Sequence, residues 1–95
     1  MDKTFLTKIE LDETDYFSIL KKIGKRIKII RIEKDLSLLE LSLITDLSTS
    51  YLSKIENGKA YKPTLQLYLK ICQGLEIKPS EILIILDKLS PFDSF

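Results

Sequence analysis

The chain has 95 residues, of which 44% are hydrophobic and 31% are charged, so it has the size and composition of one soluble domain with one modest core. A single cysteine excludes an internal disulfide framework and suits a reducing cytosol. The absence of histidine removes the usual zinc ligands and the usual base of a Ser/His or Cys/His enzyme. The longest apolar run, at 82–86, is far too short to span a bilayer, and no signal-peptide pattern is present. We therefore expect a cytoplasmic protein that is not an enzyme, without metal, cofactor or membrane contact.

The net charge of +1 conceals an uneven charge distribution along the chain. Residues 1–15 hold two basic and five acidic residues, residues 21–62 hold ten and five, and residues 63–95 hold three and four. A lysine-rich stretch is most often a solvated helix face, so charge alone assigns no partner. The basic centre favours an anionic partner only if a binding motif accompanies it.

The first predicted element is a long helix over 13–34 that Asp12 is placed to cap. Residues 4–11, TFLTKIEL, precede it and alternate imperfectly, which fits either a short strand or a frayed arm. Apolar residues spaced by four and three form one stripe of the helix, which we expect to be buried: Tyr16, Leu20, Ile23, Ile27 and Ile30.

Two short helices follow, separated by a very short turn. Ser37 and Glu40 form a capping-box pattern for the first, and Ser48 can cap the second. Asn57 and Gly58 end the second helix, because glycine tolerates the left-handed conformation that closes a helix. Since the turn at 45–48 has only about four residues, the two helices must cross steeply, as in a helix-turn-helix motif.

Two further helices complete the predicted fold. Thr64 can cap a helix that reaches about residue 74, and Pro79 occupies the first turn of a helix that reaches about residue 89. We therefore expect one all-α domain over 1–95, with an N-terminal arm at 1–12 and a C-terminal tail at 90–95.

The third helix is unusually polar for so small a protein. In the stretch 48–57, STSYLSKIEN, only Leu52 and Ile55 have the character of core anchors. The rest of that helix is therefore expected to face a wet surface. Lys54, Lys59 and Lys62 indicate that the partner on this surface is anionic.

Three blocks of sequence, in this order and spacing, resemble the helix-turn-helix domain of phage repressor and Cro proteins, the Xre family. They are IGKRIKIIR at 23–31, LSLLELSLITDLSTSYLSKIENGK at 36–59 and PTLQLYLKICQGLEIKPSEIL at 63–83. The resemblance implies a five-helix phage-repressor-like fold, here with an N-terminal extension of the first helix, whose third helix enters the DNA major groove. It further implies a sequence-specific DNA-binding transcriptional regulator, and in particular a homodimeric repressor that binds a two-fold symmetric operator in double-stranded DNA.

The matching positions also imply roles for single residues. The candidate base readers are Thr49, Ser50, Ser53 and Lys54. The first two hydroxyls could instead satisfy free N–H groups at the helix start. The candidate contacts to the DNA backbone are Tyr51, Lys59, Tyr61, Lys62, Lys25 and Lys28. A structural ion pair, which would join the first helix to the third, is expected between Arg31 and Glu56; the alternative is that Arg31 belongs to the basic surface.

The chain departs from the family pattern at four positions. Leu38 replaces a glutamine that usually binds phosphate, so that contact is expected to be missing or replaced by apolar contact. Ser42 replaces an alanine at the helix crossing, a small change that the packing is expected to accept if the hydroxyl bonds back to its own helix. Asp46 replaces the turn glycine and is expected to adopt a left-handed conformation. Glu76 stands where a glycine commonly ends the fourth helix, so the exit from that helix is expected to differ.

The fifth helix carries the apolar run ILIIL, which leaves a strip uncovered if one side faces the core. The resemblance implies that a second copy covers the strip, and the alternative is that the acidic arm or the PFDSF tail folds back over it. The candidate dimer residues are Ile84, Ile85 and Leu89. The arm and the tail also keep open a second interpretation: an antitoxin or protein-partner module of a toxin–antitoxin or phage switch system, with DNA binding for autoregulation.

Overall fold

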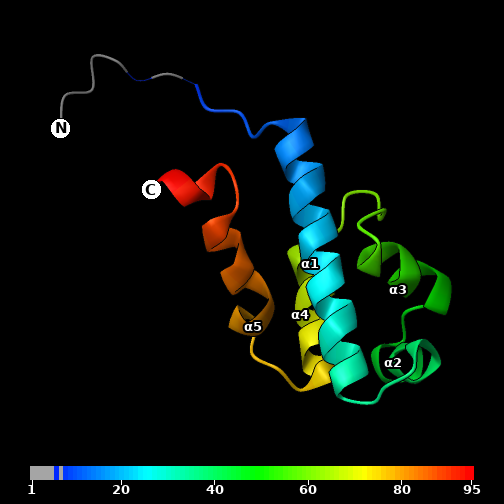
Figure 1. The fold of residues 1–95 in the computed structure, drawn as a ribbon. Helices are drawn as coiled ribbons and strands as arrows, with labels where there is room; N and C mark the ends of the chain where they lie inside the picture. Colours follow the sequence, from blue (N-terminus) through cyan, green and yellow to red (C-terminus); the bar gives the residue numbers. More distant parts are fainter. Residues whose placement is uncertain (1–5, 7) are drawn as a thin grey trace.

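The computed structural model describes residue 6 and residues 8–95, which form five α-helices and two 3-10 segments (Figure 1). The helices are α1 (Glu13–Glu33), α2 (Leu38–Thr45), α3 (Thr49–Glu56), α4 (Leu65–Leu75) and α5 (Ser80–Leu83). The 3-10 segments are η1 (Ile84–Lys88) and η2 (Phe92–Ser94). No strand occurs in the described residues, which confirms the all-α fold with five helices. Residues 4, 5 and 7 of the predicted strand or arm lie outside the described residues, and the rest of that segment has no regular secondary structure.

Each of the first four helices begins at the residue that the sequence predicts. The side chains of Asp12, Ser48 and Thr64 accept hydrogen bonds from backbone N–H groups in the first turns of α1, α3 and α4. At the start of α2, Ser37 and Glu40 form both hydrogen bonds of a capping box, each 3.0 Å long. These bonds satisfy N–H groups that would otherwise have no partner within the helix.

The core lies between α1 and the shorter helices around it. The predicted stripe of α1 is buried, except that Tyr16 is half-buried. Gly24 allows a close approach of α1 and α3, because a Cβ atom there would lie 2.2 Å from the carbonyl oxygen of Ile55. The shorter helices contribute fully buried side chains, namely Leu41, Leu52, Ile55, Ile71, Leu75 and Ile82. Within the described part of the chain, no helix has both the length and the apolar character that crossing a membrane requires.

The turn between α2 and α3 is held by side-chain hydrogen bonds. Asp46 ends α2 in the left-handed conformation, with φ 59° and ψ 24°, as predicted. The condition set for Ser42 is not met, because its hydroxyl donates forward to the carbonyl oxygen of Leu47 at 2.6 Å and not back to its own helix. Ser42 therefore ties the turn to α2.

The end of α4 also differs from the prediction. Glu76 itself adopts the left-handed conformation, with φ 56°, so the exit keeps the geometry that a glycine would give. Gly74 has a packing role, since a Cβ atom there would lie 2.7 Å from the methyl carbon of Thr45 in α2. The expected change in the exit from α4 is therefore not found.

The fifth helix is the largest departure from the sequence prediction. It is α-helical only to Leu83 and continues to residue 88 as the 3-10 segment η1. Ile85, within η1, and Leu89, directly after it, are both half-buried against the core. Ile84 is left as the most exposed member of the predicted strip, at 61% exposure.

Candidate nucleic-acid interface

The helix α3 has two chemically distinct faces. Leu52 and Ile55 are fully buried against the core, as predicted, and Glu56 is buried beside them. At 100° per residue, the four candidate base readers lie together on the opposite face. Three of them, Thr49, Ser50 and Lys54, are exposed, and Ser53 is half-buried. Together with α2, α3 forms the part of the molecule that lies on the right in Figure 1, on one side of α1.

The hydroxyls at the start of α3 have separate tasks. The cap is Ser48, whose Oγ accepts the backbone N–H of Tyr51 at 3.0 Å. Thr49 and Ser50 are therefore not needed for that cap, and their exposed hydroxyls are available to a partner. At the other end of the helix, the side-chain amide of Asn57 donates to the carbonyl oxygen of Ser53 at 2.8 Å.

An ion pair between Arg31 of α1 and Glu56 fixes the rotation of α3. Arg31 donates from Nε to Glu56 Oε2 at 2.7 Å and from Nη2 to Glu56 Oε1 at 3.0 Å. Its Nη1 donates to the carbonyl oxygen of Leu36 at 2.8 Å. The side chains are only 11% and 4% exposed. The hydrogen bonds to Glu56 raise the pKa of Arg31 despite the opposing effect of burial. This two-point contact holds α3 in one orientation on α1.

The loop after α3 presents cations and an aromatic ring to solvent. Lys59, Tyr61 and Lys62 are exposed, and the Lys62 ammonium lies 5.4 Å from the centroid of the Tyr61 ring. Lys62 has a left-handed backbone, with φ 43°. Tyr51, the other aromatic candidate, is half-buried and packs partly against the core.

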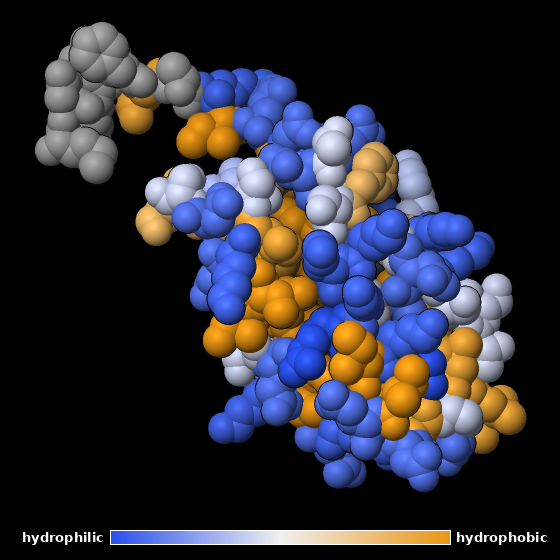
Figure 2. Space-filling model, viewed as in Figure 1, coloured by the Kyte–Doolittle hydropathy of each residue, from blue (hydrophilic) through white to orange (hydrophobic). Residues whose placement is uncertain are grey.

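The lysines of α1 continue this basic surface. Lys25 and Lys28 are exposed and line a groove of about 380 Å³. Its other lining residues are Lys21, Ile29, Ile32, Glu56 and Asn57. Gly58, with φ 69°, brings the loop onto α1, since a Cβ atom there would lie 2.6 Å from the Cα atom of Lys21. Figure 2 shows the surface over the middle of α1 as mostly hydrophilic, with hydrophobic side chains near its lower end. Lys21 and Asn57 were not predicted, because only the contact of the loop with α1 brings them beside the candidate residues.

The described residues do not form a metal-binding site. No group of three His, Cys, Asp or Glu side chains lies close enough to hold a metal ion in the part of the chain that the structure describes. Cys72 is buried in the core, and burial raises the pKa of its thiol. The thiol therefore packs as a small apolar group.

Comparisons with known proteins identify the family of this chain. Residues 27–82 match the family HTH_3, described as helix-turn-helix. Over 60 residues the chain is 37% identical to the HTH-type transcriptional regulator SlrR of Bacillus subtilis (strain 168), a match that covers 63% of this chain and 40% of SlrR. The chain thus spans less than half the length of that curated relative.

Solved structures show the same fold. The restriction-modification controller protein C.AhdI from Aeromonas hydrophila is 32% identical, with a TM-score of 0.65 over 68% of this chain and 97% of its own. An HTH_3 family transcriptional regulator from Vibrio cholerae is 28% identical, with a TM-score of 0.68 over 74% of this chain and 39% of its own. The clp gene regulator ClgR from C. glutamicum is 26% identical, with a TM-score of 0.65 over 70% and 84%. The chain therefore belongs to the HTH_3 family of helix-turn-helix proteins, and it shares its fold with proteins named as a transcriptional regulator and as a restriction-modification controller protein.

Proposed function

We propose that this chain is a sequence-specific DNA-binding transcriptional regulator that reads the major groove with α3. The observation that carries the proposal is the division of α3 into a buried face with two apolar anchors and a polar face with three hydroxyls and Lys54. Hydroxyl groups can donate to or accept from base edges, and a lysine can reach the O6 and N7 atoms of guanine. The buried pair of Arg31 and Glu56 keeps this face in a fixed orientation.

The cations around α3 have the placement expected of phosphate contacts. Lys59 and Lys62 follow α3 in the chain, and Lys25 and Lys28 lie along α1 beside the end of α3. Contacts to phosphates fix the position of a protein on DNA but carry no sequence information. We assign Lys21 to the same group, because it lines the groove that holds Lys25 and Lys28.

We further propose that the chain acts as a homodimeric repressor on a two-fold symmetric operator. The support is Ile84, a large aliphatic side chain that is 61% exposed. It begins η1, the continuation of α5, and α5 lies on the side of α1 away from α3 in Figure 1. A two-fold contact there would present two copies of α3 about one DNA turn apart, roughly 34 Å. The C-terminal tail, which is the alternative to a second copy as a cover for this strip, lies beside Leu83 and Leu86 and leaves Ile84 exposed.

One pair of variants tests the assignment of reading and positioning. Lys54→Ala should relax the preference for the operator over random DNA, whereas Lys62→Ala should weaken binding to all sequences similarly. Alanine at 62 keeps the left-handed strain of a non-glycine residue, so relief of backbone strain does not enter the comparison. Lys70→Ala removes an exposed lysine from α4 and serves as the matched control. An unchanged sequence preference in Lys54→Ala would exclude Lys54 as a base reader.

A second candidate function is an antitoxin or protein-partner module whose DNA binding serves autoregulation. The observation that favours it is the outer face of α2, where large aliphatic side chains are exposed: Leu39, Leu43 and Ile44. A helix that faces only water or phosphate has no need of three such residues. In this case the chain should copurify with a second protein at fixed stoichiometry, and Leu43→Glu should abolish that complex while DNA binding remains. Copurification that Leu43→Glu leaves intact would remove this support.

A further inference from the structure

We propose that the groove beside α1 binds an acidic segment of a partner protein that also carries apolar side chains, and that this segment competes with DNA. The competition rests on the proposed function, because the groove holds the lysines of α1 that are assigned to phosphate contacts. We call it the lysine groove. It has a volume of about 380 Å³, and its lining residues on α1 are Lys21, Lys25, Lys28, Ile29 and Ile32.

The lysine groove contains apolar side chains that a contact with phosphates does not require. Ile29 is 39% exposed and Ile32 is 57% exposed. Lysine binds DNA phosphates through its charge, so the two isoleucines add nothing to that contact. Single exposed apolar residues are common on protein surfaces, but here two of them share one groove with three cations. A protein segment that carries both carboxylates and apolar side chains matches both parts of this lining.

The side chains of the groove form one track along α1. At 100° per residue, the five residues fall on one side of the helix, opposite its buried stripe. From Lys21 to Ile32 the track is about 16 Å long, or about three helical turns. The lysines occupy its first part and the isoleucines its last, and Figure 2 shows hydrophobic side chains near the lower end of α1, which is its C-terminal end in Figure 1. A short amphipathic helix can lie along such a groove.

The charge of the lysine groove selects an acidic occupant. Lys21, Lys25 and Lys28 are exposed, and within the described part of the chain none of them forms an ion pair. Glu56 also borders the groove, but its carboxylate already accepts two hydrogen bonds from Arg31. The three ammonium groups are therefore open to carboxylates of a partner, and complementary charge favours both the rate and the specificity of such an encounter.

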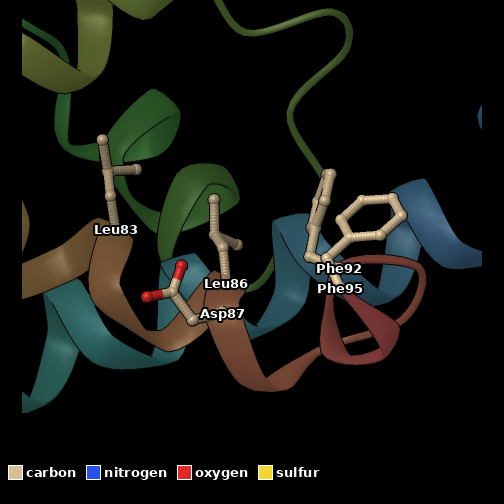
Figure 3. Close-up of a pocket in the computed structure, with 5 residues that line it drawn as sticks. All are labelled: Leu83, Leu86, Asp87, Phe92 and Phe95. Carbon is tan, nitrogen blue, oxygen red and sulfur yellow. The ribbon is translucent and has the colours of Figure 1, made fainter. Parts of the chain in front are cut away.

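A second groove has the opposite charge. It lies beside the C-terminal tail and is lined by Leu83, Leu86, Asp87, Phe92 and Phe95 (Figure 3). The charged residue among these five is Asp87, which repels an acidic segment. Of these two grooves, the lysine groove is the one that offers both apolar side chains and cations.

An acidic segment in the lysine groove prevents the DNA contacts of α1, because both ligands need the same ammonium groups. A carboxylate held by Lys25 or Lys28 takes the place of a phosphate. Asn57, at the end of α3, also lines the groove, so the bound segment lies next to the recognition helix. Each ligand therefore lowers the apparent affinity of the chain for the other. The concentration of the partner would then control how much of the chain is bound to DNA.

Selection from a random library of peptides of about 15 residues, long enough for three helical turns, tests the inference with the full chain. The enriched peptides should combine Asp or Glu with Leu, Ile or Phe. Random-sequence duplex DNA should release them, since phosphate contacts do not depend on sequence. Fluorescence anisotropy of one enriched peptide, made synthetically with a fluorescein label, then gives dissociation constants for the variants.

A pair of double variants isolates the apolar part of the groove. Ile29→Ser combined with Ile32→Ser keeps all three lysines and should weaken peptide binding about tenfold or more, which corresponds to about 1.4 kcal/mol. Its binding to random-sequence duplex DNA should stay within about twofold of the wild type, because the phosphate contacts remain. Leu65→Ser combined with Leu69→Ser is the matched control, since these side chains of α4 are 63% and 43% exposed. Melting curves by circular dichroism check that both variants fold.

A third variant tests the shared cations. Lys25→Ala combined with Lys28→Ala should weaken the binding of both the peptide and the duplex. Added salt should also weaken both, because it screens the charges of the exposed lysines.

The loss of peptide binding in Ile29→Ser with Ile32→Ser, without a loss in the control, supports the inference. Peptides that lack acidic residues, no enrichment at all, or simultaneous binding of peptide and duplex would overturn it. If the serine substitutions weaken the duplex as much as the peptide, the isoleucines contact DNA, and the inference fails while the proposed function stands. A wild type that binds the peptide but no duplex DNA removes the proposed function, and the competition with it, although the peptide site remains.

Discussion

Removing the carboxylate of Glu56 should destabilise the fold more than any change to an exposed residue. In Glu56→Gln the volume of the side chain is kept, but the guanidinium of Arg31 loses its charged partner inside the protein. Removing one partner of a buried pair costs about 3–5 kcal/mol, because the other charge remains away from water. Arg31 keeps its hydrogen bond to the carbonyl oxygen of Leu36, so we expect the lower end of this range, about 3 kcal/mol.

A loss of this size is readily measured. For a domain of 60–100 residues, about 1 kcal/mol shifts the melting temperature by about 4–8 °C, so the expected fall is about 12–24 °C. Urea denaturation followed by circular dichroism gives the free energy of unfolding directly. Glu33→Gln changes an exposed carboxylate of α1 and should stay within about 0.5 kcal/mol of the wild type.

A double variant distinguishes the cost of an unpaired buried charge from the cost of a lost contact. Arg31→Met combined with Glu56→Leu removes both charges, and replacing a buried pair by apolar groups of similar volume is often neutral. We expect the double variant to recover most of the stability that Glu56→Gln loses. If the free energy of unfolding of Glu56→Gln lies within about 1 kcal/mol of the wild-type value, the pair does not hold α3 in the way that its geometry suggests.

Three further predictions concern DNA binding, the turn and alkaline pH. A dimer that makes about six to eight phosphate contacts should show a slope of roughly −5 to −7 in log binding constant against log salt, and a flat dependence would count against a DNA role. Asp46→Gly should raise the free energy of unfolding by about 1 kcal/mol by relieving left-handed strain, and a lower melting temperature would show that Asp46 has another role. Burial raises the pKa of Tyr68 to about 12, so the neutral phenol favours the native state. This contribution to stability is present below about pH 10 and disappears as the pH rises through about 12. An absorbance titration should therefore show a tyrosine that ionises near pH 12, and Tyr68→Phe should remove that transition. An unchanged titration in Tyr68→Phe would mean that the transition does not belong to Tyr68.

Local signals account for what the sequence predicts well. The caps of α1 to α4 are bonds between residues two or three apart, and the buried stripe of α1 follows from its period alone. The same period groups Thr49, Ser50, Ser53 and Lys54 on one face once Leu52 and Ile55 are taken as anchors. Neither conclusion depends on how distant segments pack.

The features that sequence reasoning missed depend on such packing. The run ILIIL is compatible with an α-helix, and the change to 3-10 geometry after Leu83 occurs where the chain meets η2 and the tail. Arg26 donates to the carbonyl oxygen of Glu81 at 3.0 Å, a contact across 55 positions that no local pattern indicates. Lys21 and Asn57 join the candidate interface only because Gly58 lets the loop lie on α1.

Selection of bound sequences from random double-stranded DNA tests directly whether α3 reads base edges. We expect the chain to enrich one sequence with two-fold symmetry, whose half-sites lie about 10–10.5 base pairs apart, centre to centre. Repeating the selection with Lys54→Ala should broaden the base preference at defined positions in each half-site, since Lys54 lies on the exposed face of α3. Enrichment of no sequence above the starting pool would contradict the proposal that α3 reads DNA.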